Sequence, residues 1–549
     1  MKIGRLLVAM LLLLSLSACE IFGNGFESDS PSTWENGISV RENTLLKTLH
    51  FSLSDSNIKD SKIKNFRDCV DRCENIYYNE KKTSPQELKN ALYEMKAALD
   101  WFDRQRDIAD YLYMYDTTDI TAKENYTYAE QIYTQIRGEY WSCIGGILNT
   151  AKARLPIVKR FVDEEHGPLL TVYFDNDDYY LRERELYAEF CSYNFKGTAE
   201  QIHGIFTEYL CVSRTYAQSY GCDDFYEYTT RHQLYRDYGK EEREQFREYV
   251  KRYLIPLYLE YHARSDAMYN SLGFLQRRKS DAYYSLPFDQ FDQNYLFLYF
   301  DSLPDSIGNT MRSALEQGHV IIGDQPGSQK KASFMFCGDD PVCYFHESCL
   351  DLISVSHELG HYCKNTIHGV NANISYDMSE VHSQANSLLM LRYLRDVIDS
   401  RAYDSFEVYE IENILYQTIL ATVKDEFDER IYSDPDAHTY TADELTAIME
   451  NLIQEYGIDK IGGSLERHLK TYWHRQGMNS PAYNLSYATS AVIALQIYYM
   501  SETDYAAATE CYRLLIEEID FTSTFLGTLE DAGLYSPFDE QLYLNLTTK

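Results

Sequence analysis

The stretch LDLISVSHELGH, residues 350–361, contains His357, Glu358 and His361 in the pattern His-Glu-x-x-His. On a helix the two histidines lie one turn apart on the same face. Imidazoles so placed bind one zinc ion, and Glu358 beside them can accept a proton from the attacking water. Gly360 leaves room for another segment to approach closely. A chance match is expected in roughly a few per cent of chains this rich in histidine, and the apolar residues before the motif favour a buried metal helix.

Glu380 is the predicted third ligand, because a protein zinc site needs at least three protein donors. It opens a leucine-rich helical segment. Asp377 precedes it by three residues, where its carboxylate can accept a hydrogen bond from a ligand imidazole and orient that ring. His382 is a competing third ligand, although on a helix it points away from Glu380. The sequence therefore predicts one Zn²⁺ ion bound by the two histidines of the motif and Glu380.

The N-terminus reads as a targeting segment. Two basic residues in the first five are followed by an apolar run, residues 6–14, that is short for a membrane span. Residues 16–19, LSAC, resemble the lipobox of bacterial lipoproteins. This resemblance implies a signal peptide over residues 1–18, lipidation of Cys19, and a protein held outside the cytoplasm on a bacterial membrane. The alternative is a plain signal peptide with a chance cysteine.

The rest of the chain is predicted to be mainly helical. Apolar residues at helical spacing over residues 88–102, and similar patterns over 121–155 and 240–275, indicate long helices, the last interrupted at Pro256. Strand signals are sparse and are confined to three short stretches: 169–174, 319–322 and 333–337. We expect a tether over 19–45, an N-terminal helical region over 46–200 and a catalytic region over 201–549.

Charge excludes one class of partner. The chain has 51 basic and 85 acidic residues, a formal charge of −34, whereas a nucleic-acid binder needs a basic surface. Twelve cysteines are present, and lipidation of Cys19 would leave an odd number. Cys337 and Cys343 flank a turn and are candidates for a disulfide, but spacing alone does not determine connectivity.

Five stretches resemble the thimet oligopeptidase and oligoendopeptidase F superfamily of zinc peptidases. They are YAQSYG at 216–221, residues 331–337 before the metal helix, EVHS at 380–383, YNLSYATS at 483–490, and residues 531–538. The resemblance covers most of the chain from about residue 200. It implies a mainly α, two-lobed body with a deep substrate cleft and a small β element beside the metal helix, and it implies zinc ligation by the residues named above.

The resemblance also implies residues that contact the scissile carbonyl. His474, Tyr483 and Tyr487 stand at the matching positions. Tyr487 matches best, whereas Leu485 stands near Tyr483 where the family often has a tyrosine. The alternative for both tyrosines is ordinary packing in the core.

The chain departs from the family in three respects. The interval between His361 and Glu380 is short for the family and equals that of the aminopeptidase N family, whose Gly-x-Met-Glu-Asn and Asn-Glu-Gly-Phe motifs are absent. Residues 346–349, HESC, stand where small residues and glycine are usual. Most relatives are cytosolic, whereas this chain reads as exported. We expect a zinc endopeptidase acting on short peptides; the alternatives are an aminopeptidase and a catalytically silent peptide-binding lipoprotein.

Overall fold

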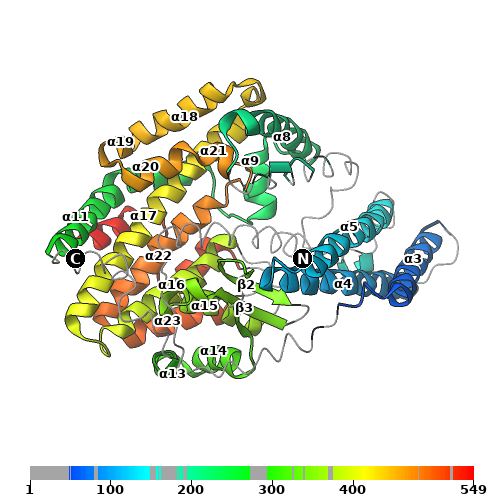
Figure 1. The fold of residues 1–549 in the computed structure, drawn as a ribbon, viewed down its shortest axis with the longest axis horizontal. Helices are drawn as coiled ribbons and strands as arrows, with labels where there is room; N and C mark the ends of the chain where they lie inside the picture. The colour runs from blue at the N-terminus through cyan, green and yellow to red at the C-terminus, as the bar shows by residue number, and fades with distance from the viewer. Residues whose placement is uncertain are drawn as a thin grey trace. The chain divides into compact units, whose positions relative to one another are not determined.

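The computed structural model describes residues 49, 51–78, 85–148, 156–158, 160–161, 182, 185–187, 189–190, 193, 196–271, 293–323, 327–337, 340–368, 375–479, 481–519 and 523–548. The predicted signal peptide, Cys19, the tether and the strand at 169–174 lie outside these residues. The chain forms two compact units (Figure 1). The described part of the first unit falls within residues 39–178 and 314–349, and that of the second within 179–313 and 350–549.

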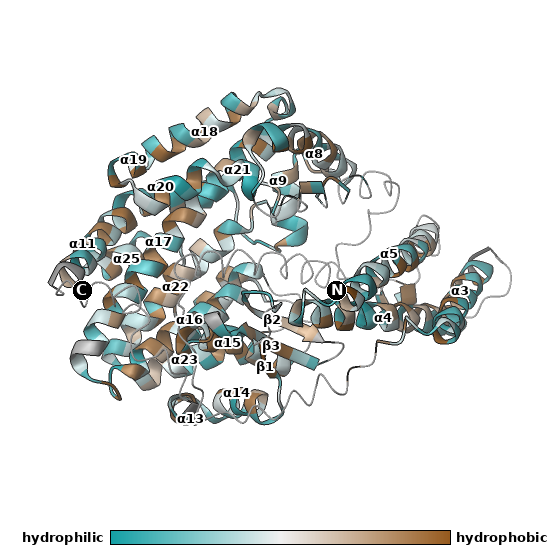
Figure 2. Ribbon diagram, in the orientation of Figure 1, coloured by the Kyte–Doolittle hydropathy of each residue, from teal (hydrophilic) through white to brown (hydrophobic). Residues whose placement is uncertain are grey.

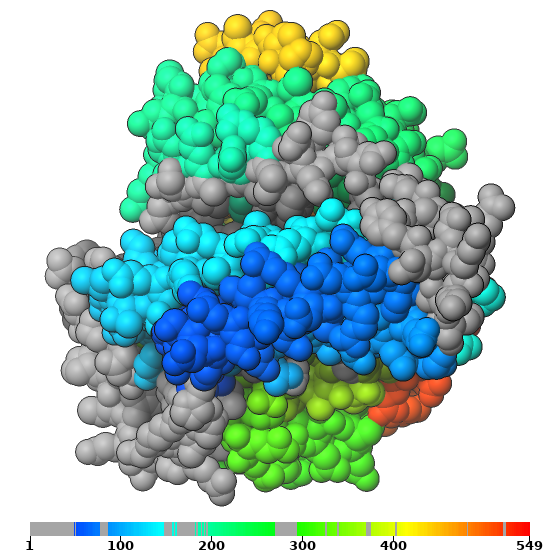
Figure 3. All heavy atoms as spheres, turned by 90° about the vertical axis from the view of Figure 1, so that its right-hand side faces the viewer, coloured from blue at the N-terminus to red at the C-terminus, as the bar shows by residue number. Residues whose placement is uncertain are grey.

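Three long helices form the core of the first unit: α3 (Ser56–Tyr78), α4 (Pro85–Tyr115) and α5 (Ile120–Leu148). The apolar residues predicted at helical spacing are all buried: Leu88, Leu92, Met95, Leu99 and Phe102. Figure 2 shows hydrophobic and hydrophilic bands alternating along α4, and Figure 3 shows α3 and α4 next to each other at the surface. The helical prediction for this region is confirmed, with α5 ending at Leu148 within the described residues.

A small sheet completes the first unit. Its strands are β1 (Val320–Gly323), β2 (Ala332–Cys337) and β3 (Asp340–His346), in the order β1-β3-β2. β1 pairs with β3 in parallel, and β2 pairs with β3 antiparallel, so that Cys343 lies opposite both Val320 and Phe334. Two of these strands were predicted. β3 was not among the strand candidates, because it is the central strand and reads as a continuous buried run without alternation.

The structure does not support the candidate pairing of Cys337 with Cys343, which the spacing had left open. Cys343 is buried in β3 as a free thiol, and in the register of the hairpin Cys337 lies opposite Asp340. A cross-strand pair needs its two residues opposite each other, which this register does not provide.

The second unit is built from helices. In chain order they are α8 (Ala199–Ser219), α9 (Phe225–Tyr228), η3 (Thr229–Gln233), α10 (Lys240–Tyr249), η4 (Val250–Leu254), α11 (Ile255–Ser271), α13 (Gln293–Asp301), α15 (Leu352–His368), α16 (Tyr376–Leu394), α17 (Ser400–Ser433), η8 (Ala437–Thr439), α18 (Ala442–Glu455), α19 (Ile458–Ile461), α20 (Gly463–Lys470), α21 (Tyr472–Arg475), α22 (Asn484–Thr503), α23 (Tyr505–Glu517), α24 (Phe525–Asp531) and α25 (Glu540–Thr547). Between α13 and β1, α14 (Asp305–Glu316) spans the boundary between the two units' sequences, and the turn η6 (Glu347–Cys349) follows β3.

Two helices of this unit are buried on nearly every face. α16 packs between α15 and α22, and α22 also packs against α17 and α23 (Figure 1). A helix without an exposed polar stripe belongs in the centre of a large core. Each polar side chain on such a helix is buried and must therefore have a hydrogen-bond partner within the protein.

The helix expected over 240–275 is continuous through Pro256 as far as Ser271. A π-helical turn, η4, ends at Leu254, two residues before the proline. Proline has no N–H and its ring crowds the carbonyl four residues earlier, so a wider turn at this point avoids the break that was predicted. The fold class is therefore confirmed as mainly α with one small sheet. Among the described helices, none combines the length and the apolar character needed to cross a bilayer.

Candidate metal centre

The histidine motif lies on α15, whose start is set by Asp351. The carboxylate of Asp351 accepts hydrogen bonds from the backbone N–H of Ser354 at 2.8 Å and from its hydroxyl at 2.6 Å. A side chain that caps the first turn in this way favours helix formation at that point. Within α15 the rings of His357 and His361 lie 5.2 Å apart between centroids. The predicted placement on one helix face is confirmed.

Glu380 comes from α16, which Ser375 caps through the backbone N–H of Asp377. Its Oε2 atom lies 4.0 Å from Nε2 of His357 and 3.9 Å from Nε2 of His361. One donor atom of each of the three residues lies within 4.8 Å of the others. The structure thus brings together the three predicted ligands. Among the described residues, they form the one such group of histidine, cysteine and acidic side chains.

Close packing of α15 on α16 makes this arrangement possible. A Cβ atom on Gly360 would lie 2.5 Å from the carbonyl oxygen of His382 and 2.8 Å from Cα of Ser383. The amide of Asn386 donates to the carbonyl of Ser356 at 2.6 Å and so joins the same two helices. The close approach predicted at Gly360 is confirmed, and the approaching segment is the helix that carries Glu380.

Burial sets the charge state of the group. Desolvation lowers the pKa of His357 to about 4 and lowers that of His361 well below its usual value. Desolvation also raises the pKa of Glu380 to about 7, against hydrogen bonds from Tyr483 and Ser383 that act in the other direction. Both imidazoles are therefore neutral at pH 7, with a nitrogen lone pair free to bind a metal.

These donors fit zinc. Two nitrogens and one carboxylate oxygen are a common zinc ligand set. Two donors on one zinc ion, each about 2.0–2.1 Å from it, are at most about 4.2 Å apart. The separations of 3.9 and 4.0 Å from Glu380 to the imidazoles lie within that limit. A buried carboxylate whose charge is disfavoured by desolvation also gains from a divalent cation beside it.

Two further side chains lie at the group. Glu358 follows His357 on α15 and is buried. Tyr487, on α22, has a pKa that is raised first by burial and then by the negative charge of Glu380, against a hydrogen bond with Tyr483 that lowers it; the charge of Glu358 adds a smaller rise. Tyr487 is partly exposed. The roles of Glu358 as the base and of Tyr487 as a hydroxyl donor stay predictions.

Tyr483 has a different contact from the one predicted. Its hydroxyl donates to Oε1 of Glu380 at 2.5 Å, and its ring packs edge-on against Tyr487 with centroids 5.1 Å apart. The residue is buried. A hydroxyl proton already given to a ligand carboxylate is not free for a substrate carbonyl, so the structure favours a role for Tyr483 in holding Glu380.

Asp377 does not accept a hydrogen bond from a ligand imidazole in the described structure, and that prediction is wrong. Its Oδ2 accepts from Arg236 at 3.3 Å and from Tyr238 at 3.1 Å, and its Oδ1 accepts from Thr489 at 3.1 Å. The reason is the helix register: Asp377 lies one turn before Glu380 and is fully buried against a cation from another segment. It acts on Glu380 through its charge, which raises the pKa of that residue.

The two remaining candidate histidines, His382 and His474, have hydrogen-bond partners in the backbone. His382 is fully buried and its Nε2–H donates to the carbonyl of Leu515 at 2.9 Å, toward α23, so it points away from Glu380 as expected. His474 lies on α21, where Nδ1–H donates to the carbonyl of Gly197 at 2.8 Å. The described contacts of His474 do not include the three ligands, and its contact with substrate stays a prediction.

Sequence reasoning missed Arg236, the partner of Asp377. It is buried with its guanidinium fully enclosed, and it lies 141 residues before Asp377 in the sequence. No local spacing relates two such distant residues. The available signal was indirect. The helix was predicted to open at Glu380 but begins at Tyr376, so that Asp377 lies inside it, and a buried aspartate needs a partner such as a cation.

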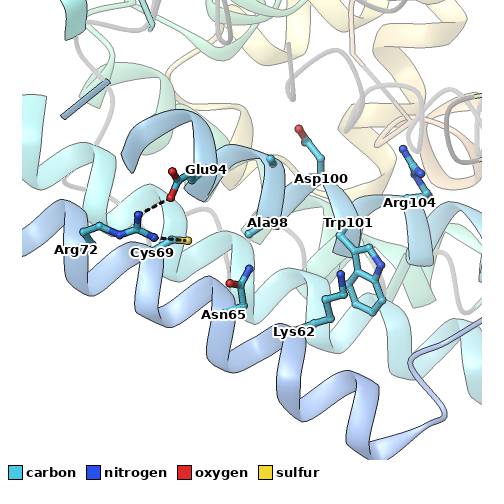
Figure 4. Close-up of a pocket in the computed structure, with 10 residues that line it drawn as sticks. Lys62, Asn65, Cys69, Arg72, Glu94, Ala98, Asp100, Trp101 and Arg104 are labelled. Atoms are coloured by element: carbon cyan, nitrogen blue, oxygen red, sulfur yellow. Dashed lines mark hydrogen bonds and ion pairs between the residues drawn. The ribbon is translucent and has the colours of Figure 1, made fainter. Parts of the chain in front are cut away.

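A groove between α3 and α4 of the first unit has its own set of charges (Figure 4). Arg72 binds Glu94 at 2.5 Å and also contacts Cys69, and Lys62 lies over the ring of Trp101 at 5.0 Å. These charged groups have partners on the same two helices. The groove contains none of the predicted site residues, so the group of His357, His361 and Glu380 in the second unit is the candidate site.

Comparison with solved structures identifies the fold. PZ peptidase A with inhibitor 2 matches with a TM-score of 0.64 and 15% identity, over 89% of this chain and 96% of that one. A Bacillus anthracis str. Ames protein assigned as an oligoendopeptidase F matches with a TM-score of 0.63 and 16% identity, over 89% and 94%. This is the oligoendopeptidase F fold. The oligoendopeptidase-F of Enterococcus faecium shares it with a TM-score of 0.55 and 12% identity, over 90% and 97%.

Comparisons by sequence find no match, whereas the comparison of structures does. Neither a protein-family profile nor a curated protein sequence matches the chain. The fold that the resemblance implied is therefore confirmed, and it extends through nearly the whole of each of these solved chains.

Proposed function

We propose that the protein is a zinc-dependent endopeptidase that hydrolyses internal bonds of short peptides outside the cytoplasm. One observation carries the proposal: His357, His361 and Glu380 converge beside Glu358 and Tyr487, within the oligoendopeptidase F fold. The lipobox at the N-terminus supports export and anchoring to a bacterial membrane through Cys19. The strongly negative charge argues against nucleic acid as a partner.

The residues of the chain have distinct parts in this reaction. A zinc ion held by the three ligands would supply Lewis acidity toward a peptide carbonyl and lower the pKa of water to about 7. Glu358 takes the proton of the attacking water and passes it to the leaving amine. Tyr487 is protonated at neutral pH, because the pKa of a tyrosine hydroxyl is ordinarily about 10 and burial raises it further here. Its hydroxyl donates to the developing oxyanion.

The two alternatives differ in what they predict for peptides. An aminopeptidase requires a free N-terminus, and a silent peptide-binding lipoprotein turns over nothing. The presence of Glu358 beside the ligands argues against the silent protein, because peptide binding alone has no use for a general base. The absence of the Gly-x-Met-Glu-Asn motif argues against the aminopeptidase.

The test uses one internally quenched peptide in two forms, with both ends blocked or with a free N-terminus. We expect cleavage of the blocked form at an internal bond, loss of activity on chelation, and recovery on addition of zinc. Cleavage of the free form alone would establish the aminopeptidase. Binding of the blocked peptide without turnover, by zinc-loaded protein, would establish the silent lipoprotein.

A further inference from the structure

The two oxygens of Glu380 have different surroundings. Oε2 faces the imidazoles of His357 and His361, and it also accepts a weak hydrogen bond from Ser383 at 3.3 Å. Oε1 accepts the hydroxyl of Tyr483 at 2.5 Å. A metal ion held by the two imidazoles would therefore have one oxygen of the carboxylate available to it, because the other accepts from a buried donor.

Tyr483 is itself held by an unusual piece of backbone. Ala482, directly before it, has φ of +68°, a conformation that residues with a side chain rarely adopt. Two buried charges hold this residue from both sides. Its N–H donates to Oδ2 of Asp428 at 3.4 Å, and its carbonyl accepts from Nη2 of Arg236 at 2.7 Å.

Arg236 joins this segment to the helix of Glu380. Its Nε donates to Asp377, one turn before Glu380 on α16, and its Nη2 donates also to Ser486 near the start of α22. The residue before it, Tyr235, has φ of +53°. Among the described residues other than glycine, Tyr235 and Ala482 are the two with positive φ. Tyr235 directly precedes Arg236 in the chain, and the carbonyl of Ala482 accepts a hydrogen bond from the guanidinium of Arg236.

We propose that Arg236 and Tyr483 are positioning residues for Glu380, an inference that rests on the proposed zinc site. Arg236 sets the start of α22 against the start of α16, and this places the hydroxyl of Tyr483 on Oε1. Oε2 alone then remains for the metal. A carboxylate that binds through one oxygen leaves a coordination position open, which a catalytic zinc site requires.

The experiment compares Tyr483→Phe with Tyr498→Phe. Tyr483 is the N-cap residue directly before α22, and the control Tyr498 lies within that helix. Tyr498 is fully buried and also donates its hydroxyl to a carboxylate, Oε1 of Glu407 at 2.6 Å. Both variants lose one buried hydroxyl, so their effects on thermal stability should be similar. Only Tyr483→Phe should weaken zinc binding in a chelator competition, by about 10–100-fold, as is usual when a partner of a metal ligand is removed.

A spectrum provides a second readout that does not depend on activity. With Co²⁺ bound in place of zinc, the visible absorption reports the number and arrangement of ligands. We expect Tyr483→Phe to change this spectrum, because Oε1 becomes free to reach the metal, and Tyr498→Phe to leave it unchanged. Unchanged zinc affinity and an unchanged Co²⁺ spectrum in Tyr483→Phe would overturn the inference.

A second variant tests Arg236. Arg236→Lys keeps the positive charge but loses the planar guanidinium, whose separate N–H groups donate to Asp377 and to the carbonyl of Ala482 at the same time. Its control is Arg243→Lys, a buried arginine paired with Glu429 at 2.6 Å. If Arg236 acts through Tyr483, the variant that combines Arg236→Lys with Tyr483→Phe should bind zinc no more weakly than whichever single variant has the lower zinc affinity. If the losses of zinc-binding free energy in the two single variants add up in the double variant, this inference is contradicted. A parent protein that binds no zinc would instead refute the proposed function itself.

Discussion

Gly360→Ala is a direct test of the contact that brings the ligands together. The added Cβ would lie 2.5 Å from the carbonyl oxygen of His382, at least about 0.5 Å closer than real Cβ contacts. The atoms that it meets are backbone atoms of α16, so no side chain can rotate out of the way. The two helices must separate.

The size of the effect follows from two opposed terms. Overpacking of a tight contact costs about 1–3 kcal/mol, whereas alanine in place of glycine in a helix gains up to about 1 kcal/mol. With the full helix gain, we expect a net loss of up to about 2 kcal/mol. Because zinc needs the parent spacing between His361 and Glu380, each ~1.4 kcal/mol of strain that falls on the bound state weakens zinc binding about tenfold.

Thermal unfolding and chelator competition measure the two effects. Gly204→Ala on α8 is the matched control, because a Cβ there meets no atom within 4 Å, so it should leave zinc affinity unchanged and should not lower stability. A Gly360→Ala protein with parent stability and parent zinc affinity would refute the reasoning, since it would show that α15 and α16 are not in the contact described.

The remaining predictions concern single side chains and pH. Glu358→Gln should stay folded and zinc-loaded but hydrolyse a blocked quenched peptide at least about 10²-fold more slowly; near-parent turnover would remove Glu358 as the base. Glu380→Ala should lose most zinc in metal analysis, whereas His382→Ala should keep it because its Nε2 is bound to the carbonyl of Leu515; the reverse result would make His382 the ligand. Zinc affinity measured by chelator competition should fall about tenfold for each pH unit below 7, because the pKa of Glu380 is raised to about 7 and its proton must leave before it binds metal; a flat profile between pH 5 and 7 would contradict the raised pKa. Cys19→Ala should release the protein from the membrane fraction or leave its precursor uncleaved, and unchanged fractionation would exclude the lipid anchor.

The sequence by itself determined the features that depend on short spacing. Helical periodicity placed His357 and His361 on one face of a helix, and the structure confirms this geometry. Glycine at position 360 indicated a close contact, because only a residue without Cβ allows one. The mainly helical class followed from the same periodicity, which is a local property of the chain.

Only the tertiary structure decided which partner each polar side chain has. Tyr483 was predicted to contact the substrate. Because α22 packs against α16, the hydroxyl of Tyr483, at the start of α22, instead donates to Glu380, which is 103 residues away in the sequence. Asp377 was assigned to an imidazole, but a buried arginine from a distant segment binds it instead. Spacing along the chain determines which face of a helix a residue occupies. The packing of helices that are far apart in sequence determines what that face meets, and for Tyr483, Asp377 and Arg236 this packing decides the role.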